Sequence, residues 1–172
     1  MSFLVLSIPH QTVRFSVRLL LTAMTRCQEV GSMLFDLQNA HHAHANGRLR
    51  REPIIWLSTV RRDGRPHLVP VWFLWDGATI LIFSQPDAQK IRNLRASPHV
   101  CLALEAAADG GDVVILEGVA AFITLRDAEP AFAAFTTRYG EHMARMGWTL
   151  ETMLADYSLP VRVTPTRLIA WR

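Results

Sequence analysis

Lys90 is the residue of this sequence whose type and position best suit ligand chemistry. It is the only lysine in a chain with seventeen arginines, and it lies just inside a short predicted helix that follows an apolar strand, in ILIFSQPDAQKIRNLRASP (residues 80–98). We expect Asp87 to be the N-cap of that helix, so that free backbone N–H groups and the positive end of the helix dipole meet an ammonium group. This combination predicts an anion site. The alternative is an ordinary surface lysine in water.

The other side chains that could do chemistry form weaker patterns. His41, His42 and His44 are adjacent or close in sequence but have no matched carboxylates or cysteines, so no metal site is expected. Glu105 and Glu117 lie in apolar strands, where an edge or salt-bridged carboxylate is a simpler interpretation than a tuned acid. The chain has no GxGxxG, Walker or GxSxG motif. The sequence therefore assigns no catalytic acid or nucleophile.

The elements that would position Lys90 are mainly strands, separated by tight turns at Asp63-Gly64 and Asp76-Gly77. Strands are expected at 54–60, 66–75, 78–84, 99–106, 112–124 and 160–171. Helices are expected from residue 34 to near Gly47, around Lys90, over 126–140 with Gly140 as the C-cap, and over 149–157. The order predicts a meander of antiparallel strands with flanking helices.

The strand at 66–75 is unusual because both of its faces are apolar. A strand that buries only one face would alternate apolar with polar residues. One face can fill a small barrel, but the other then needs a helix, a flat cofactor or a partner subunit as a cover. Pro70 cannot donate a ladder hydrogen bond, which favours an edge or a place where the sheet opens. A split β-barrel with a cleft beside this strand is the predicted fold.

The sequence resembles the pyridoxamine 5′-phosphate oxidase-like split β-barrel family, and within it the branch of probable coenzyme F420-dependent oxidoreductases. The resemblance covers residues 33–172, and its most specific pieces are PVWFLWDG and SQPxxxKxRN. It implies a homodimer with each cofactor in a cleft at the subunit interface. The cofactor ring would lie against the strand that contains Val69 to Trp72, and its phosphate near the strand end and the following helix. The residues expected at the cofactor are Val69, Pro70, Val71, Trp72, Phe83, Ser84, Gln85, Gln89 and Lys90.

Two departures from the family pattern bear on the choice of cofactor. FMN-binding members carry arginines where this chain has His67 and Gln89. An FMN phosphate would lose its bidentate partners, which counts against FMN and leaves F420 as the expected cofactor. Arg92 or Arg95 could serve the anionic tail of F420, although both could equally form a solvated face.

Composition places the chain among single-domain proteins that bury a core without disulfides. Half of its 172 residues are hydrophobic and the net charge is +3, of which +2 falls in residues 1–32. The body is therefore nearly neutral, and no basic run with interleaved aromatics suggests nucleic-acid binding. We expect residues 1–32 to be a leader, either loosely attached or produced by an upstream start codon; an export signal and an interfacial helix are the alternatives. No apolar run is long enough to span a bilayer, and the two distant cysteines favour a reducing, cytoplasmic location.

Three functions remain open from the sequence. The leading hypothesis is an F420-dependent oxidoreductase that passes a hydride to a small, apolar or planar acceptor. The second is an FMN-dependent oxidase or reductase of the same fold. The third is a flavin or F420 carrier without turnover, which the absence of a recognisable catalytic side chain favours. In a cofactor enzyme the hydride chemistry belongs to the cofactor, so that absence does not exclude catalysis.

Overall fold

Strands rich in β-branched and aromatic residues build a curled antiparallel sheet in the computed structural model, which describes residues 34–172. The strands are β1 (Ile54–Val60), β2 (Pro66–Trp72), β3 (Leu74–Trp75), β4 (Ile80–Ser84), β5 (His99–Ala103), β6 (Val113–Phe122) and β7 (Leu159–Trp171). The helices are α2 (Ala40–Arg51), α3 (Gln89–Ala96), α4 (Leu125–Ala128), α5 (Phe132–Arg145) and α6 (Leu150–Asp156), with a 3₁₀ turn at Glu129–Ala131. The leader expected at residues 1–32 lies outside the described residues.

The strand order shows how the sheet almost closes on itself. The order is β2-β1-β5-β6-β7-β4-β3, and all pairings are antiparallel. The two edges, β2 and β3, belong to the single extended segment 66–75. Because one segment pairs with β1 at its start and with β4 at its end, it joins the two edges of the sheet. The predicted split β-barrel is confirmed, and Pro70 lies on the edge strand, as its missing N–H requires.

The split lies at Phe73, where the expected continuous strand 66–75 is interrupted. Here the Tyr139 hydroxyl of α5 replaces a strand neighbour: it accepts a hydrogen bond from Phe73 N–H at 2.9 Å. The same hydroxyl lies 2.7 Å from the carbonyl of Phe73 and 2.9 Å from that of Pro53, to either of which it can donate. Phe73 is fully buried, so these contacts satisfy backbone groups that would otherwise lack partners. The prediction of one uninterrupted strand was therefore wrong at this residue.

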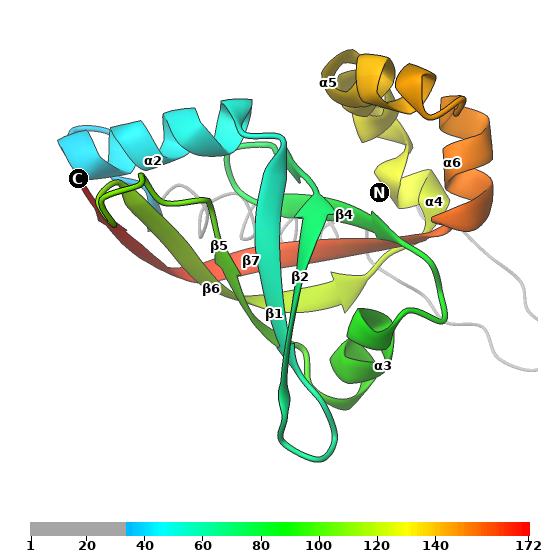
Figure 1. Cartoon of the computed structure of the whole chain (residues 1–172), viewed down its shortest axis with the longest axis horizontal. Coiled ribbons are helices and arrows are strands. Elements are labelled where there is room, and N and C mark those ends of the chain that lie inside the picture. Colours follow the sequence, from blue (N-terminus) through cyan, green and yellow to red (C-terminus); the bar gives the residue numbers. More distant parts are fainter. Residues whose placement is uncertain (1–33) are drawn as a thin grey trace, which may run out of the picture.

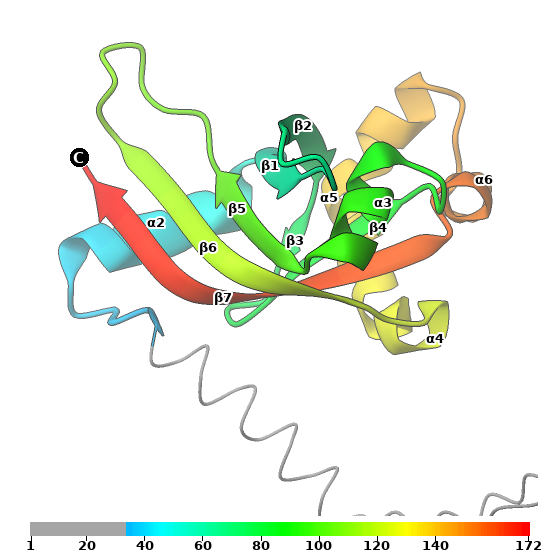
Figure 2. The same ribbon diagram turned by 90° about the horizontal axis from the view of Figure 1, so that it is seen from below.

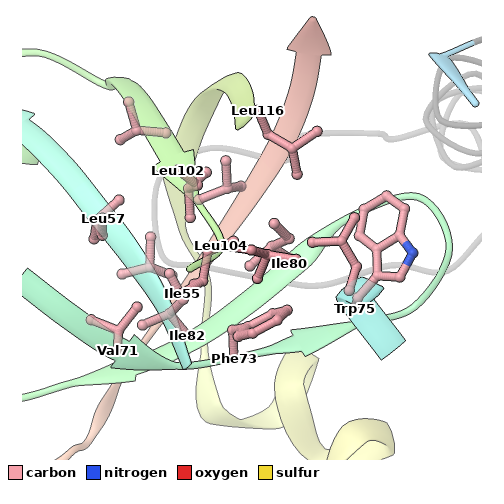
Figure 3. Close-up of a cluster of buried hydrophobic side chains, with 14 of the residues drawn as sticks. Ile55, Leu57, Val71, Phe73, Trp75, Ile80, Ile82, Leu102, Leu104 and Leu116 are labelled. Atoms are coloured by element: carbon pink, nitrogen blue, oxygen red, sulfur yellow. The ribbon is translucent and has the colours of Figure 1, made fainter. Parts of the chain in front are cut away.

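Alternation along the segment sends neighbouring residues to two different hydrophobic clusters. Val71, Phe73 and Trp75 point into the barrel, where they meet residues from β1, β4, β5 and β6 (Figure 3). Trp72 and Leu74 point outward and pack against a second cluster that includes Phe135 and Met153 of the helices. The sequence argument that the outer face needs a cover is thus confirmed for this part of the segment, and the cover is helical.

Four of the five described α-helices lie at the two ends of the molecule, and α3 lies apart from them (Figure 1). Figures 1 and 2 both place α2 near the C-terminus of the chain and α4, α5 and α6 together at the opposite end. Arg138 of α5 connects the two groups, since it donates to the backbone carbonyls of Leu49, Arg50 and Glu52 at the end of α2. These are the carbonyls that a helix C-terminus leaves without partners. Among residues 34–172 no helix is long and apolar enough to cross a bilayer.

The predicted bounds of two helical stretches were wrong. Helix α2 begins at Ala40 rather than at residue 34, and the single helix expected over 126–140 is divided into α4, the 3₁₀ turn and α5. The ends expected at the two glycines were wrong as well. Helix α2 passes through Gly47 and continues to Arg51, and α5 passes through Gly140 and continues to Arg145. The residues beyond each glycine explain the extension. Leu49 after Gly47 and Met143 after Gly140 are buried, so packing outweighs the cost of about 1 kcal/mol for a glycine inside a helix. The observed strands are also shorter than expected at several ends, and β4 begins at Ile80 rather than 78.

Candidate functional site

A pocket of about 380 Å³ opens beside the split of the barrel. Its first wall comes from the sheet and the start of α3. The residues of this wall are Ile54, Pro70, Val71, Trp72, Phe83 and Lys90. Five of these were expected at a cofactor from the sequence, and they come together from β2, β4 and α3. Pockets of this size and apolar character hold ligands with the dimensions of a ring system.

The second wall of the pocket comes from α5, α6 and the corner between them. Its residues are Phe135, Met146, Trp148, Met153 and Tyr157. The sequence reasoning missed all five. Phe135 is fully buried and also lines the pocket. The subunit-interface position implied by the family resemblance stays a prediction.

Trp72 is held in one orientation by α5. Its indole stacks on the Tyr139 ring with centroids 4.8 Å apart and planes 9° apart. Phe135 and His142 lie at its other sides, 6.2 and 6.1 Å away between centroids. Since one face of the indole is covered by Tyr139, only the opposite face can meet a ligand in the pocket. The Tyr139 hydroxyl that bridges the split therefore also fixes a wall of the site.

Lys90 is the charged residue of the pocket lining. It is the second residue of α3, partly buried, and desolvation by burial lowers the pKa of its ammonium. No ion pair or hydrogen bond joins its side chain to another residue within 34–172. A partly buried cation without a carboxylate partner is poorly solvated in the free protein. An anion that reaches it would replace the lost water.

The start of α3 differs in one respect from the sequence prediction. Its N-cap is Ala88, which makes no side-chain cap hydrogen bond, and not Asp87. The backbone carbonyl of Asp87 instead accepts a hydrogen bond from Arg92. Asp87 is exposed, and the chain still turns into the helix through the bond from Ala88 N–H to the Gln85 carbonyl. With no carboxylate capping it, the N-terminus of α3 stays electropositive beside Lys90.

Four predicted cofactor residues do not line the pocket. Val69 packs against the barrel core, and Gln85 is exposed. Ser84 is fully buried and donates its hydroxyl to the Gln85 carbonyl. Gln89 is engaged on both sides of its amide: it donates to Asn93 and accepts from Arg92. Their role at a cofactor stays a prediction, and Ser84 and Gln89 would first have to exchange these partners.

Arg92, Arg95 and His67 are further basic residues near Lys90. Arg92 is tied to Gln89 and Asp87, and the Arg95 guanidinium lies 6.0 Å from the centre of the Phe122 ring. Neither lines the pocket. Burial lowers the pKa of His67, and the positive charges of Arg61 and Lys90 lower it further. The lowered pKa favours the neutral form of His67 more than in a free imidazole, so His67 contributes less positive charge near Lys90 than an arginine would.

The histidines of α2 are used in other contacts. His42 Nδ1 accepts the backbone N–H of Asp36, and His44 Nε2 lies 2.7 Å from the Asp112 carboxylate. Arg48, almost fully buried, lies 3.1 Å from the same carboxylate. In the part of the chain that the structure describes, no three His, Cys, Asp or Glu side chains gather as a metal ion would need.

The chain is similar to solved structures that share the split barrel. An F420 reductase is 25% identical with a TM-score of 0.55, and the match covers 72% of this chain and 94% of that one. The heme storage protein HutZ of Vibrio cholerae is 21% identical with a TM-score of 0.58, over 73% of this chain and 91% of that one. A FAD-binding protein of Mesorhizobium loti is 19% identical with a TM-score of 0.57, over 73% and 90%. No curated protein sequence matches the chain.

The family model described as pyridoxamine 5′-phosphate oxidase matches residues 42–172, a range that contains the whole barrel and both walls of the pocket. It also contains the two sequence pieces on which the resemblance rested, and the strand order agrees with a split barrel. The chain belongs to the pyridoxamine 5′-phosphate oxidase-like split barrel family.

Proposed function

We propose that the protein is an F420-dependent oxidoreductase that binds the deazaflavin ring in the pocket between the split of the barrel and α5–α6. The observation that carries the proposal is the combination of flat aromatic walls with one partly buried ammonium that has no partner among residues 34–172. Trp72 and Phe135 offer apolar surface to a ring, and Lys90 offers a charge to an anionic tail. A bound deazaflavin would supply the hydride chemistry.

The protein's own residues have binding and orienting roles in this proposal. Trp72 presents one face to the ring because Tyr139 covers the other. Lys90 and the open N-terminus of α3 attract the tail. The α5–α6 wall excludes water from the ring. The acceptor would be small and apolar or planar, since the described lining holds few polar groups besides Lys90 and the Tyr157 hydroxyl.

Preference for F420 over FMN rests on the charges beside the pocket. Where FMN-binding relatives carry two arginines, this chain has His67, whose lowered pKa favours the neutral ring, and Gln89, whose amide already bonds to Asn93. An FMN phosphate, with a charge between −1.5 and −2 at neutral pH, would meet a single cation. Similarity to an F420 reductase at 25% identity supports the same choice.

The proposal is tested by titrating the protein with F420 and with FMN, using calorimetry and cofactor fluorescence, and then measuring turnover with reduced cofactor and a panel of acceptors. The expected result is tighter binding of F420 than of FMN, followed by acceptor reduction. Purification as a yellow protein with stoichiometric FMN and no measurable affinity for F420 would reverse the cofactor choice in favour of an FMN enzyme. Tight F420 binding without turnover of any acceptor would favour a carrier, which the scarcity of proton donors in the described lining also supports.

A further inference from the structure

The corner between α5 and α6 has a defined backbone geometry. Helix α5 ends in a Schellman motif: Gly147 N–H bonds to the Ala144 carbonyl at 3.0 Å, and Trp148 N–H bonds to the Met143 carbonyl at 2.8 Å. Gly147 has φ +71°, the left-handed conformation that this motif requires. Thr149, two residues after Gly147, is the N-cap of α6 and forms a capping box. Trp148 is therefore held between two hydrogen-bonded helix ends rather than on a free loop.

The fixed backbone places Trp148 in the pocket wall. Trp148 packs on Tyr157 with ring centroids 5.8 Å apart, and both residues line the pocket. Met146, on the other side of Gly147, also lines it and is 46% exposed, so it lies at the rim. The sheet wall contributes Trp72, whose free face is turned away from Tyr139. The pocket thus has an indole on each of its two walls.

Two indoles favour one shape of ligand over another. Flat conjugated rings gain offset-stacked or edge-to-face contacts with indoles that flexible aliphatic chains of equal apolar area cannot make. Lys90 attracts an anionic group whatever the shape of the rest of the ligand, so it contributes charge but no discrimination of shape. Charge selection therefore comes from the sheet wall, which carries Lys90, whereas shape selection comes from the indoles of both walls, and Trp148 is the indole on the wall without Lys90.

We propose that Trp148, positioned by Gly147, is the specificity-determining residue that makes this pocket select flat aromatic anions over aliphatic anions. The inference rests on the proposed function, because the selected group would be the ring of the cofactor or of a planar acceptor. It assigns to the α5–α6 corner a role separate from the anion contact at Lys90.

The test compares two ligands that carry the same charge on different skeletons, naphthalene-2-sulfonate and octane-1-sulfonate, by isothermal titration calorimetry. The parent protein is expected to bind the naphthalene compound more tightly. Trp148→Leu is expected to reduce the ratio of the two affinities by roughly three- to tenfold, because one aromatic contact is lost while apolar area is largely kept. Lys90→Ala should weaken both compounds and leave their ratio unchanged. An unaltered ratio in Trp148→Leu would overturn the proposal.

Gly147→Ala is a second variant, and it replaces no side chain that lines the pocket. An added Cβ at Gly147 meets no atom within 4 Å, so the substitution acts only through the backbone strain of a positive φ. Gly110→Ala is the matched control, since Gly110 has φ +78°, equally open surroundings and a place in the β5–β6 turn. Gly147→Ala is expected to lower the affinity ratio and Gly110→Ala to leave it at the parent value. Equal ratios in the two variants would show that the corner does not set selectivity.

The same titrations separate this inference from the proposed function. In one outcome, the parent prefers the naphthalene compound, Trp148→Leu loses that preference, and the parent binds neither F420 nor FMN. This outcome would refute the cofactor assignment and retain the selective role of Trp148. Binding of F420 with equal affinity by the parent and by Trp148→Leu, together with an unaltered sulfonate ratio, would retain the cofactor assignment and refute the wall.

Discussion

Replacing Lys90 by alanine is the sharpest perturbation of the proposed site. The substitution removes the cation of the described lining while leaving both aromatic walls intact. A charge-assisted hydrogen bond to a cofactor anion is worth about 1.5–3 kcal/mol, so cofactor affinity should fall roughly ten- to hundredfold. The dissociation constant for F420 is measured by fluorescence titration and confirmed by calorimetry.

Folding stability should respond differently from binding, which makes the result interpretable. Burial lowers the folded-state pKa of Lys90 below its unfolded value, so the charged form is disfavoured by folding at neutral pH. For a lysine with a lowered pKa, stability increases as pH rises from the folded pKa toward the unfolded one. Lys90→Ala removes this dependence. Its free energy of unfolding at pH 7 should equal or slightly exceed that of the parent.

Two further variants control for general charge and for shape. Arg95→Ala removes one positive charge from the same helix, but the Arg95 guanidinium packs near Phe122 and lies outside the pocket lining, so affinity should change little. Lys90→Arg should restore binding only in part, because a planar guanidinium has a different reach from an ammonium. If Lys90→Ala binds F420 as tightly as the parent, Lys90 is an ordinary surface lysine and the anion site lies elsewhere.

Four further predictions concern the scaffold. Tyr139→Phe keeps the stack on Trp72 but removes the hydroxyl that accepts the hydrogen bond from Phe73 N–H, so the free energy of unfolding measured in urea should fall by about 1–3 kcal/mol. An unchanged midpoint would show that the hydroxyl does not hold the split. For Asp112, burial alone would raise the pKa of the carboxyl, but the hydrogen bond with His44 and the charge of Arg48 outweigh burial and lower the pKa. The carboxylate therefore stabilises the fold fully above its unfolded pKa, and this stabilisation is lost as pH falls through the folded pKa. Asp112→Asn, which tolerates the observed φ of +52°, should therefore be less stable than the parent at pH 6 and approach it toward pH 3 in urea titrations. Leu68 is 58% exposed and Val60 is 47% exposed on the hairpin at the sheet edge, and we expect a homodimer to cover this face. Light scattering should show a dimer, and Leu68→Lys should weaken it. A parent protein that stays monomeric at micromolar concentration would contradict this prediction. A chain that begins at Met33 should keep the melting temperature and cofactor affinity of the full chain, and a large loss of either would show that residues 1–32 contribute to the fold.

The split barrel could be predicted from one segment because its constraints are local. A strand that is apolar on both faces and contains Pro70 can occupy few positions in a sheet. A position at an edge beside an opening suits both features. The sheet wall of the pocket comes from the same segment, so Pro70, Val71 and Trp72, which were expected at a cofactor, line the pocket together. Lys90 was singled out in the sequence because a lone lysine after an apolar strand stands out among arginines, and its contact with a cofactor stays a prediction.

The helical wall could not be predicted because its residues carry an ambiguous signal. Apolar residues at helical spacing, such as Phe135 and Tyr139, indicate a buried helix face but not what that face covers. Gly147 is the one local sign of the corner, and a glycine before Trp148 does not show that the indole faces a pocket. The misplaced ends at Gly47 and Gly140 have the same origin, since burial of later residues overrides the local preference of glycine.

Helix α5 couples the closure of the barrel to the shape of the pocket. Tyr139 supplies a hydroxyl to the interrupted strand and a ring to the indole of Trp72, so one side chain serves both purposes. Arg138, its neighbour, ties α5 to the carbonyls at the end of α2 and lies 4.9 Å from the Phe73 ring. A shift of α5 would therefore open the split, release Trp72 and move the α5–α6 corner together. Under the proposed selectivity, the choice of ligand would therefore depend on how α5 docks on the barrel, as well as on the residues that touch the ligand.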